Sequence, residues 1–304
     1  MESLKLCMST ISTPELEIPE QLPRFKEIGL DAFFTRYDPH VREYREIADR
    51  LGLIYQSVHA PNHMTEKFWD NRETARPAVE EWIQCVNDCA DAGVPIMVAH
   101  AYRGIGTHRE VTQERIDNFR YVVDAAAEKG VTVAFENTEG SEYLTVILDA
   151  FSDYPNVGFC WDTGHELCYY RGEDMTKGRG HRMICTHLND NLGCRTGDET
   201  ISAKDDLHLL PFDGAVDWQS VANRLKDWNY QGILTFELKK TAYYQHMTFE
   251  EYLREAWARI QRVTALLEIL SPDTKGIRGF LLKIRLYRGC HGHRNRCTLP
   301  HGNQ

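Results

Sequence analysis

The 304-residue sequence lacks any apolar run of the roughly 18 residues that a helix needs to cross a bilayer. Its N-terminus, MESLKLCMSTIST, lacks the basic segment and long apolar segment of a secretory signal peptide. Nine cysteines form an odd set without a repeating spacing, and Cys7, Cys160 and Cys185 lie in apolar runs, where a free thiol behaves as a small hydrophobe. These absences predict a cytoplasmic protein with reduced cysteines and no membrane partner.

Basic charge is scarce in most of the chain. The formal net charge is −10, but residues 275–304 hold seven Lys and Arg and no Asp or Glu, so residues 1–274 carry 28 basic and 45 acidic side chains, or −17. An acidic body repels the phosphates of nucleic acid, so composition argues against a nucleic-acid partner. The contrast predicts a catalytic domain over residues 1–274 and a basic tail over 275–304, which we expect to be disordered or peripheral.

Eight short β-rich runs alternate with segments of helical periodicity. Most of the runs are continuously apolar, which is typical of parallel strands covered on both faces. Several follow a glycine that would end the preceding helix, as in EIGLDAFF and EKGVTVAF. An open doubly wound sheet would normally carry a Gly-rich phosphate loop after its first strand, and MSTISTPELE lacks one. The pattern therefore predicts an α/β fold, a single-domain (β/α)8 TIM barrel. The predicted strands are 4–9, 31–36, 54–60, 95–101, 131–137, 157–163, 183–189 and 232–238.

Histidines and carboxylates follow six consecutive predicted strands, at the ends that form the active-site mouth of such a barrel. Each alone has an ordinary explanation, such as a core histidine or a helix cap. Together they would converge on one small volume, where carboxylates repel one another unless a cation lies among them. In chain order these residues are His59, His100, Glu136, Asp162, His165, His187, Asp206, His208 and Glu237.

Four of these residues suit one divalent metal ion. Glu136, Asp162, His187 and Glu237 offer the mixed oxygen and nitrogen ligands that Mn, Mg, Co or Zn accepts. Such an ion would acidify the C–H next to a bound carbonyl by stabilising an enediolate. Glu136 and Glu237 come from strands three apart, so they can lie on opposite sides of a substrate and act as the acid/base pair.

Six motifs together resemble the xylose-isomerase-like barrel superfamily, specifically its sugar phosphate isomerase/epimerase members, over about residues 4 to 270. They are SVHAP, AFENTEG, GFCWDTGHE, THLND, DLHLLPFDGAVDW and FEL. The resemblance implies one metal on Glu136, Asp162, His187 and Glu237, with Glu136 and Glu237 as acid and base. It also implies that His165 and Glu142 contact the hydroxyls of a small carbohydrate substrate. Homodimers are common in this superfamily, so a homodimer is the expectation by analogy.

The other polar residues of the mouth are expected to bind substrate: His59, His100, Asp206 and His208. The epimerase branch has an arginine six residues after the histidine of the seventh strand. Here that position is Gly193, with Arg195 two residues further on, so a strict ketose 3-epimerase assignment stays open. A phosphate on the substrate is also open, with Arg103, Arg195 and Lys239 as candidate partners.

Three other functions remain. Dehydratases of the same superfamily use the same enolate chemistry. The superfamily also contains abasic-site endonucleases, which the resemblance implies would hold three zinc ions on the nine residues of the mouth. The acidic body and the mixed charge of the loops APNHMTEKFWDNRE and AYRGIGTHRE weigh against that activity. A barrel kept only for binding would be expected to have lost a metal carboxylate, and none is missing. The preferred prediction is a metal-dependent isomerase or epimerase of a sugar, sugar phosphate or related polyol ketone.

Overall fold

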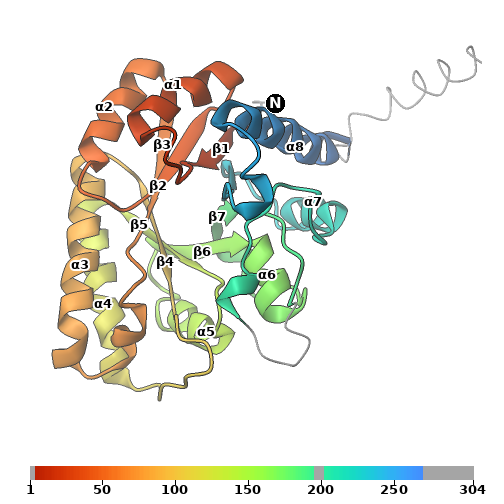
Figure 1. The fold of residues 1–304 in the computed structure, drawn as a ribbon. Coiled ribbons are helices and arrows are strands. Elements are labelled where there is room, and N and C mark those ends of the chain that lie inside the picture. The colour runs from red at the N-terminus through yellow and green to blue at the C-terminus, as the bar shows by residue number, and fades with distance from the viewer. Residues whose placement is uncertain (1–3, 195–201, 270–304) are drawn as a thin grey trace, which may run out of the picture.

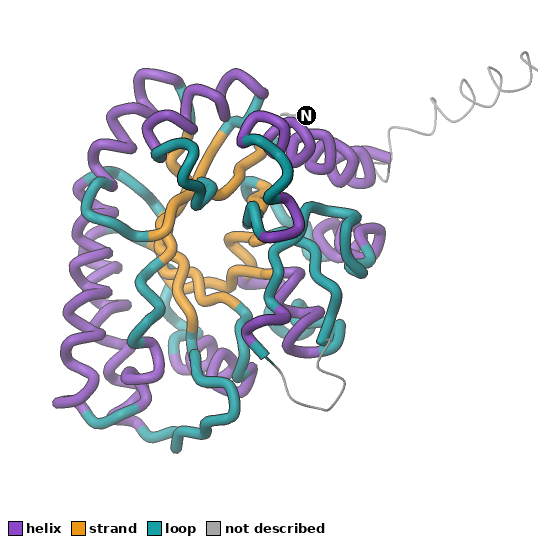
Figure 2. The backbone as a smooth tube through the Cα atoms, viewed as in Figure 1, coloured by secondary structure: helices purple, strands orange, loops and turns teal. Residues whose placement is uncertain are grey.

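Eight parallel strands ring the centre of the molecule and eight α-helices surround them in the computed structural model, which describes residues 4–194 and 202–269 (Figures 1 and 2). The strands are β1 (Leu6–Ser9), β2 (Ala32–Arg36), β3 (Ile54–His59), β4 (Ile96–His100), β5 (Thr132–Glu136), β6 (Val157–Asp162), β7 (Met183–His187) and β8 (Leu234–Phe236). The helices are α1 (Ile18–Ile28), α2 (Val41–Leu51), α3 (Arg72–Asp91), α4 (Gln113–Lys129), α5 (Ser141–Ala150), α6 (Thr163–Tyr170), α7 (Trp218–Asp227) and α8 (Phe249–Ile269).

The strands follow one another around the barrel in chain order, and β8 pairs with β1. Between β7 and β8 the ring is closed by a single parallel bridge, Leu188 to Phe236. Two backbone hydrogen bonds support this bridge: Leu188 N–H donates to Thr235 O over 2.8 Å, and Glu237 N–H donates to Leu188 O over 3.2 Å. The predicted (β/α)8 barrel is confirmed, with a nearly closed sheet.

Glycines end the helices where the sequence predicted. Gly29, Gly52 and Gly130 follow α1, α2 and α4 with φ angles of 108°, 63° and 72°. This left-handed backbone is strained for residues with a Cβ atom. At Gly29 a Cβ would also lie 3.0 Å from the Trp257 ring of α8, so this position combines a backbone and a packing requirement.

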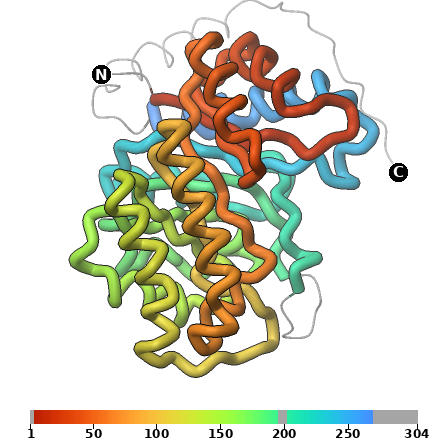
Figure 3. Tube along the Cα trace, turned by 90° about the vertical axis from the view of Figure 1, so that its left-hand side faces the viewer, coloured from red at the N-terminus to blue at the C-terminus, as the bar shows by residue number. Residues whose placement is uncertain are grey.

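The main hydrophobic core lies between the sheet and the helices, and long pairs such as α3 and α4 run side by side on the outside (Figure 3). Within the barrel, smaller clusters of buried side chains include Cys7, Cys160 and Cys185. All three are free, fully buried thiols, as predicted from their apolar surroundings. Burial raises the pKa of the Cys160 thiol well above its usual range.

The described part of the chain holds no helix that is long and apolar enough to cross a membrane. The predicted basic tail, residues 275–304, and Arg195 lie outside the described residues.

Candidate metal centre and active site

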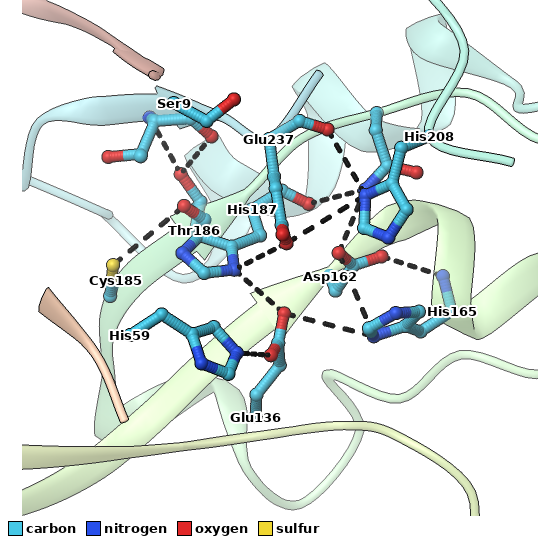
Figure 4. A network of polar contacts seen from close by, with 12 residues as sticks. Ser9, His59, Glu136, Asp162, His165, Cys185, Thr186, His187, His208 and Glu237 are labelled. Atoms are coloured by element: carbon cyan, nitrogen blue, oxygen red, sulfur yellow. Dashed lines mark hydrogen bonds and ion pairs between the residues drawn. The ribbon is translucent and has the colours of Figure 1, made fainter. Parts of the chain in front are cut away.

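Four strand ends bring the predicted metal ligands together. Glu136, Asp162 and His187 are the last residues of β5, β6 and β7, and Glu237 directly follows β8. All four side chains are buried, and one ligand atom from each lies within 4.8 Å of the others. Their side chains point toward one another at the centre of the barrel mouth (Figure 4).

Two carboxylates meet at one nitrogen of this group. Nδ1 of His187 lies 2.7 Å from Oε1 of Glu136 and 3.0 Å from Oε2 of Glu237. The two glutamates come from strands on different sides of His187, so they approach Nδ1 from two directions. We refer to Glu136, Asp162, His187 and Glu237 as the four-ligand group.

The charges of the four-ligand group depend strongly on one another. Burial lowers the pKa of the His187 imidazole, but the charges of Glu136 and Glu237 outweigh it and hold this pKa well above its usual range. Burial conversely raises the pKa of both glutamates, yet the neighbouring histidines bring the net pKa of each well below its usual range. For Asp162 burial dominates, and its pKa rises to about 7 although His165 lowers it. Three buried carboxylates around one imidazole are the donor set that a divalent cation would neutralise.

Asparagines hold Asp162 in place. Asn137 exchanges two hydrogen bonds with the backbone of Asp162, at 2.7 and 2.8 Å. Asn189 Nδ2 donates to Asp162 Oδ2 over 2.8 Å, and the backbone N–H of His165 donates to Oδ1 over 2.6 Å. Asp162 therefore caps α6 while its second oxygen is oriented by Asn189, as is usual for metal-ligating carboxylates.

A second group lies beside the first and shares Glu136 with it. Nε2 of His100 lies 3.0 Å and Nε2 of His59 lies 3.3 Å from Oε2 of Glu136. Burial is the main cause that lowers the pKa of His100 to about 4, so its ring is neutral at physiological pH. His59 Nδ1 lies 2.8 Å from the carbonyl oxygen of Ala60, which assigns the ring hydrogen to Nδ1.

His165, Asp206 and His208 form a third group at the opposite wall. Oδ2 of Asp206 lies 2.9 Å from Nε2 of His208 and 3.5 Å from Nε2 of His165. The other oxygen, Oδ1, is buried and has no hydrogen-bond partner among the described residues. A buried carboxylate oxygen without a donor fits a position where a cation or a substrate hydroxyl binds.

The long segment after β7 positions this third group. Asp190 is fully buried and accepts hydrogen bonds from Phe212 N–H at 2.8 Å, Val216 N–H at 3.0 Å and Trp218 Nε1–H at 2.9 Å. Its backbone also pairs with Leu209. These hydrogen bonds to the Asp190 carboxylate fix the path of the chain that follows Asp206 and His208.

A polar cavity of about 350 Å³ opens above these groups. Its walls include most of the residues predicted to contact substrate. They are Arg36, His59, Asn62, His100, Arg103, Thr138, Glu139, His165, Tyr169, Ala203, Asp206, His208, Glu237 and Lys239.

The structure does not bring Glu142 to this cavity. Helix α5 begins at Ser141, and Glu142 is exposed in its first turn. Glu139 lines the cavity instead, and its Oε1 accepts a hydrogen bond from Gly104 N–H over 3.0 Å. Asn137 was not predicted as a functional residue, although it directly follows Glu136 in the motif AFENTEG.

Comparisons with known proteins agree with this geometry. Residues 22–263 match the family model of the xylose isomerase-like TIM barrel. The chain is 30% identical to the uncharacterized protein y4fM of Sinorhizobium fredii, over 68% of this chain and 76% of that one. It is 27% identical to the inosose isomerase of Bacillus licheniformis, over 62% and 70%. It is 28% identical to the probable endonuclease 4 of Cenarchaeum symbiosum, over 56% of this chain and 60% of that one.

Among solved structures, the IOLI protein with a bound zinc atom has the same fold. Its TM-score is 0.69 at 20% identity, covering 86% of this chain and 98% of that one. A D-tagatose 3-epimerase-like protein gives a TM-score of 0.66 at 19% identity, covering 86% and 97%. The family model covers residues 22–263, and the chain belongs to the xylose isomerase-like TIM barrel family.

Proposed function

We propose that this protein is a metal-dependent isomerase or epimerase of a sugar, sugar phosphate or related polyol ketone. The observation that carries the proposal is the approach of Glu136 and Glu237 to the same nitrogen of His187 from two strands, beside a polar cavity that Glu237 lines. Two carboxylates placed on either side of one point can exchange protons with both faces of a planar intermediate.

The four-ligand group would hold one divalent ion, which when bound polarises the substrate carbonyl. One glutamate removes the proton from the neighbouring carbon. In epimerisation the other glutamate returns a proton on the opposite face, and in isomerisation the first returns it to the adjacent carbon. His165, which lines the cavity, donates a hydrogen bond to an oxygen on which negative charge develops, and His59, which also lines it, contacts a substrate hydroxyl.

Relatives support the same chemistry. An inosose isomerase is among the proteins of similar sequence, and an epimerase-like protein and a zinc-binding protein share the fold. The remaining cavity residues, His100, Asp206 and His208, would bind substrate hydroxyls.

The test is proton exchange with solvent. Protein loaded separately with Mn²⁺, Co²⁺, Zn²⁺ or Mg²⁺ is incubated in D₂O with a panel of ketoses and inososes, and deuterium at the carbon next to the carbonyl is followed by NMR. Metal-dependent incorporation that Glu237→Gln abolishes and the exposed Glu128→Gln retains supports the proposal. Loss of water from the substrate would instead indicate a dehydratase. No incorporation with any metal or substrate contradicts an isomerase or epimerase function.

A second candidate is a phosphodiester hydrolase with several metal ions. The observation that favours it is the presence of three adjacent ligand groups, two of which share Glu136. About three zinc ions per chain, with cleavage of an abasic-site oligonucleotide, would establish this activity. One ion per chain and an intact oligonucleotide would exclude it.

A further inference from the structure

Arg36 is a cation at the cavity mouth. It is the last residue of β2, it is exposed, and it lines the cavity. Within residues 4–194 and 202–269 its guanidinium forms no hydrogen bond, ion pair or ring contact. The carboxylate of Asp38, two residues further on, instead accepts hydrogen bonds from the backbone of His40 at 2.7 Å and from the hydroxyl of Tyr44 at 3.0 Å.

Lys239 lies on the same side of the mouth. It follows Glu237 by two residues, and both side chains line the cavity. Its Nζ lies 3.7 Å from Oδ2 of Asp206, an oxygen that already contacts His208 at 2.9 Å. At 3.7 Å this ion pair is too long for a hydrogen bond, so within the described residues the ammonium hydrogens of Lys239 are available to a ligand.

Arg36 and Lys239 also line a second hollow of about 510 Å³ next to the first. Glu237 is a wall residue of both hollows, so one molecule can extend from the acid/base pair to the two cations. The other wall residues of this hollow include hydroxyl side chains that suit a polar ligand: Ser9, Thr10, Ser12 and Thr13.

A third cation of the cavity wall, Arg103, is already held by a neighbour. Its Nη1 donates to Oδ1 of Asn62 over 2.6 Å. Within the described residues the side chains of Arg36 and Lys239 form no such hydrogen bond, and they lie at the ends of β2 and β8.

We propose that the substrate carries an anionic group, a phosphate ester or a carboxylate, which Arg36 and Lys239 bind at the end remote from the reacting carbonyl. The inference rests on the proposed function for the position of the carbonyl, and it adds the substrate class. A guanidinium and an ammonium on one wall provide charge-assisted hydrogen bonds to such a group, and neutral polyols cannot form them.

The first test measures binding without turnover. Glucitol, glucitol 6-phosphate and gluconate have no carbonyl group, so calorimetry on metal-loaded protein reports recognition alone. We expect at least one of the two anions to bind at least about tenfold more tightly than glucitol. Arg36→Gln and Lys239→Gln should remove most of that preference. Arg42→Gln, an exposed arginine on α2, is the matched control and should retain it.

The relative affinities for these three compounds identify the anionic group and can overturn the proposal. Tighter binding of glucitol 6-phosphate than of gluconate indicates a phosphate ester, and the reverse indicates a carboxylate. Equal binding of all three polyols, no binding of either anion, or an anion preference that survives both substitutions would overturn the inference.

Deuterium exchange with D-fructose and D-fructose 6-phosphate separates this inference from the proposed function. If the phosphorylated ketose is favoured, Arg36→Gln should raise its KM at least about tenfold and leave kcat nearly unchanged. Exchange with both ketoses that Arg36→Gln does not alter would overturn the inference and leave the isomerase or epimerase function standing. Anion binding that depends on Arg36, without exchange of any ketose, would support the inference and contradict the function.

Discussion

Nε2 of His59 lies 3.1 Å from Nε2 of His100. Both nitrogens also face Oε2 of Glu136, at 3.3 Å from His59 and 3.0 Å from His100. The histidine pair thereby contacts the oxygen of Glu136 that His187 does not contact.

This relationship predicts the effect of His100→Asn. The variant should keep one metal ion per chain, because the four-ligand group is intact, but lose about tenfold or more in deuterium exchange because Glu136 is less well oriented. Metal content by elemental analysis and exchange by NMR check both. A wild type with two or more ions, one of which His100→Asn loses, would contradict the single-ion assignment.

Removing either carboxylate of the acid/base pair should stop the reaction. Glu136→Gln and Glu237→Gln are each expected to lower kcat by at least about a hundredfold, since general acid–base catalysis typically contributes that much or more. Both variants should also bind metal more weakly. Glu128→Gln, exposed on α4, serves as the control. Exchange at the wild-type rate in either variant would refute the assigned roles.

Metal affinity should fall as the pH falls. The pKa of Asp162 is about 7, and that of His187 lies above its usual range, so both carry protons at low pH that the metal must displace. Below about pH 7 we expect the apparent affinity for Mn²⁺ to decrease at least roughly tenfold per pH unit. Calorimetry between about pH 6 and 8 measures this slope. A flat profile would contradict both assignments, because metal binding would then displace no proton from Asp162 or His187.

Gly164, in the first turn of α6, packs directly against Asn189. A Cβ atom there would lie 1.8 Å from Oδ1 of Asn189, the residue that orients Asp162. Gly164→Ala should therefore displace Asn189, weaken metal binding about tenfold or more, and cost about 1–3 kcal/mol of folding stability. Calorimetry and urea unfolding test this, with the exposed Glu173→Ala as control. Unchanged metal affinity would show that Asn189 does not orient Asp162.

Arg224 anchors the first turn of α6. Its guanidinium lies 2.8 Å from the buried carboxylate of Glu166 and stacks at 4.4 Å on Trp161. Arg224→Met leaves that carboxylate without its cation and should cost about 3 kcal/mol of unfolding free energy. The double variant Glu166→Gln with Arg224→Met should recover part of the loss, since no uncompensated charge stays buried. Equal stability of wild type and Arg224→Met would contradict this role.

The barrel and the meeting of the strand-end side chains could be predicted because both follow from local patterns. Apolar runs placed the strands, and the topology then required that Glu136, Asp162 and His187 meet. Supporting residues such as Asn189 and Asp190 could not be predicted, because their roles depend on tertiary partners. Glu142 was predicted to contact substrate, but the structure places it exposed in the first turn of α5. Its exposure depends on where α5 begins, which the sequence pattern did not fix.

Arg36 was overlooked for a related reason. It ends the second predicted strand, but nothing in the local sequence distinguishes it from the other candidate cations, Arg103, Arg195 and Lys239. Its significance comes from what surrounds it, namely a shared wall with Lys239 and a neighbouring aspartate that is already engaged.

The single bridge between β7 and β8 makes that junction the weakest seam of the barrel. The predicted ion would bind His187 at the end of β7 and Glu237 just after β8, so it would link the two strands that share only one bridge. Metal loading should then protect the amide hydrogens of β7 and β8 from exchange more than those of β3 and β4. The ion that polarises the substrate carbonyl would also stabilise the closure of the barrel.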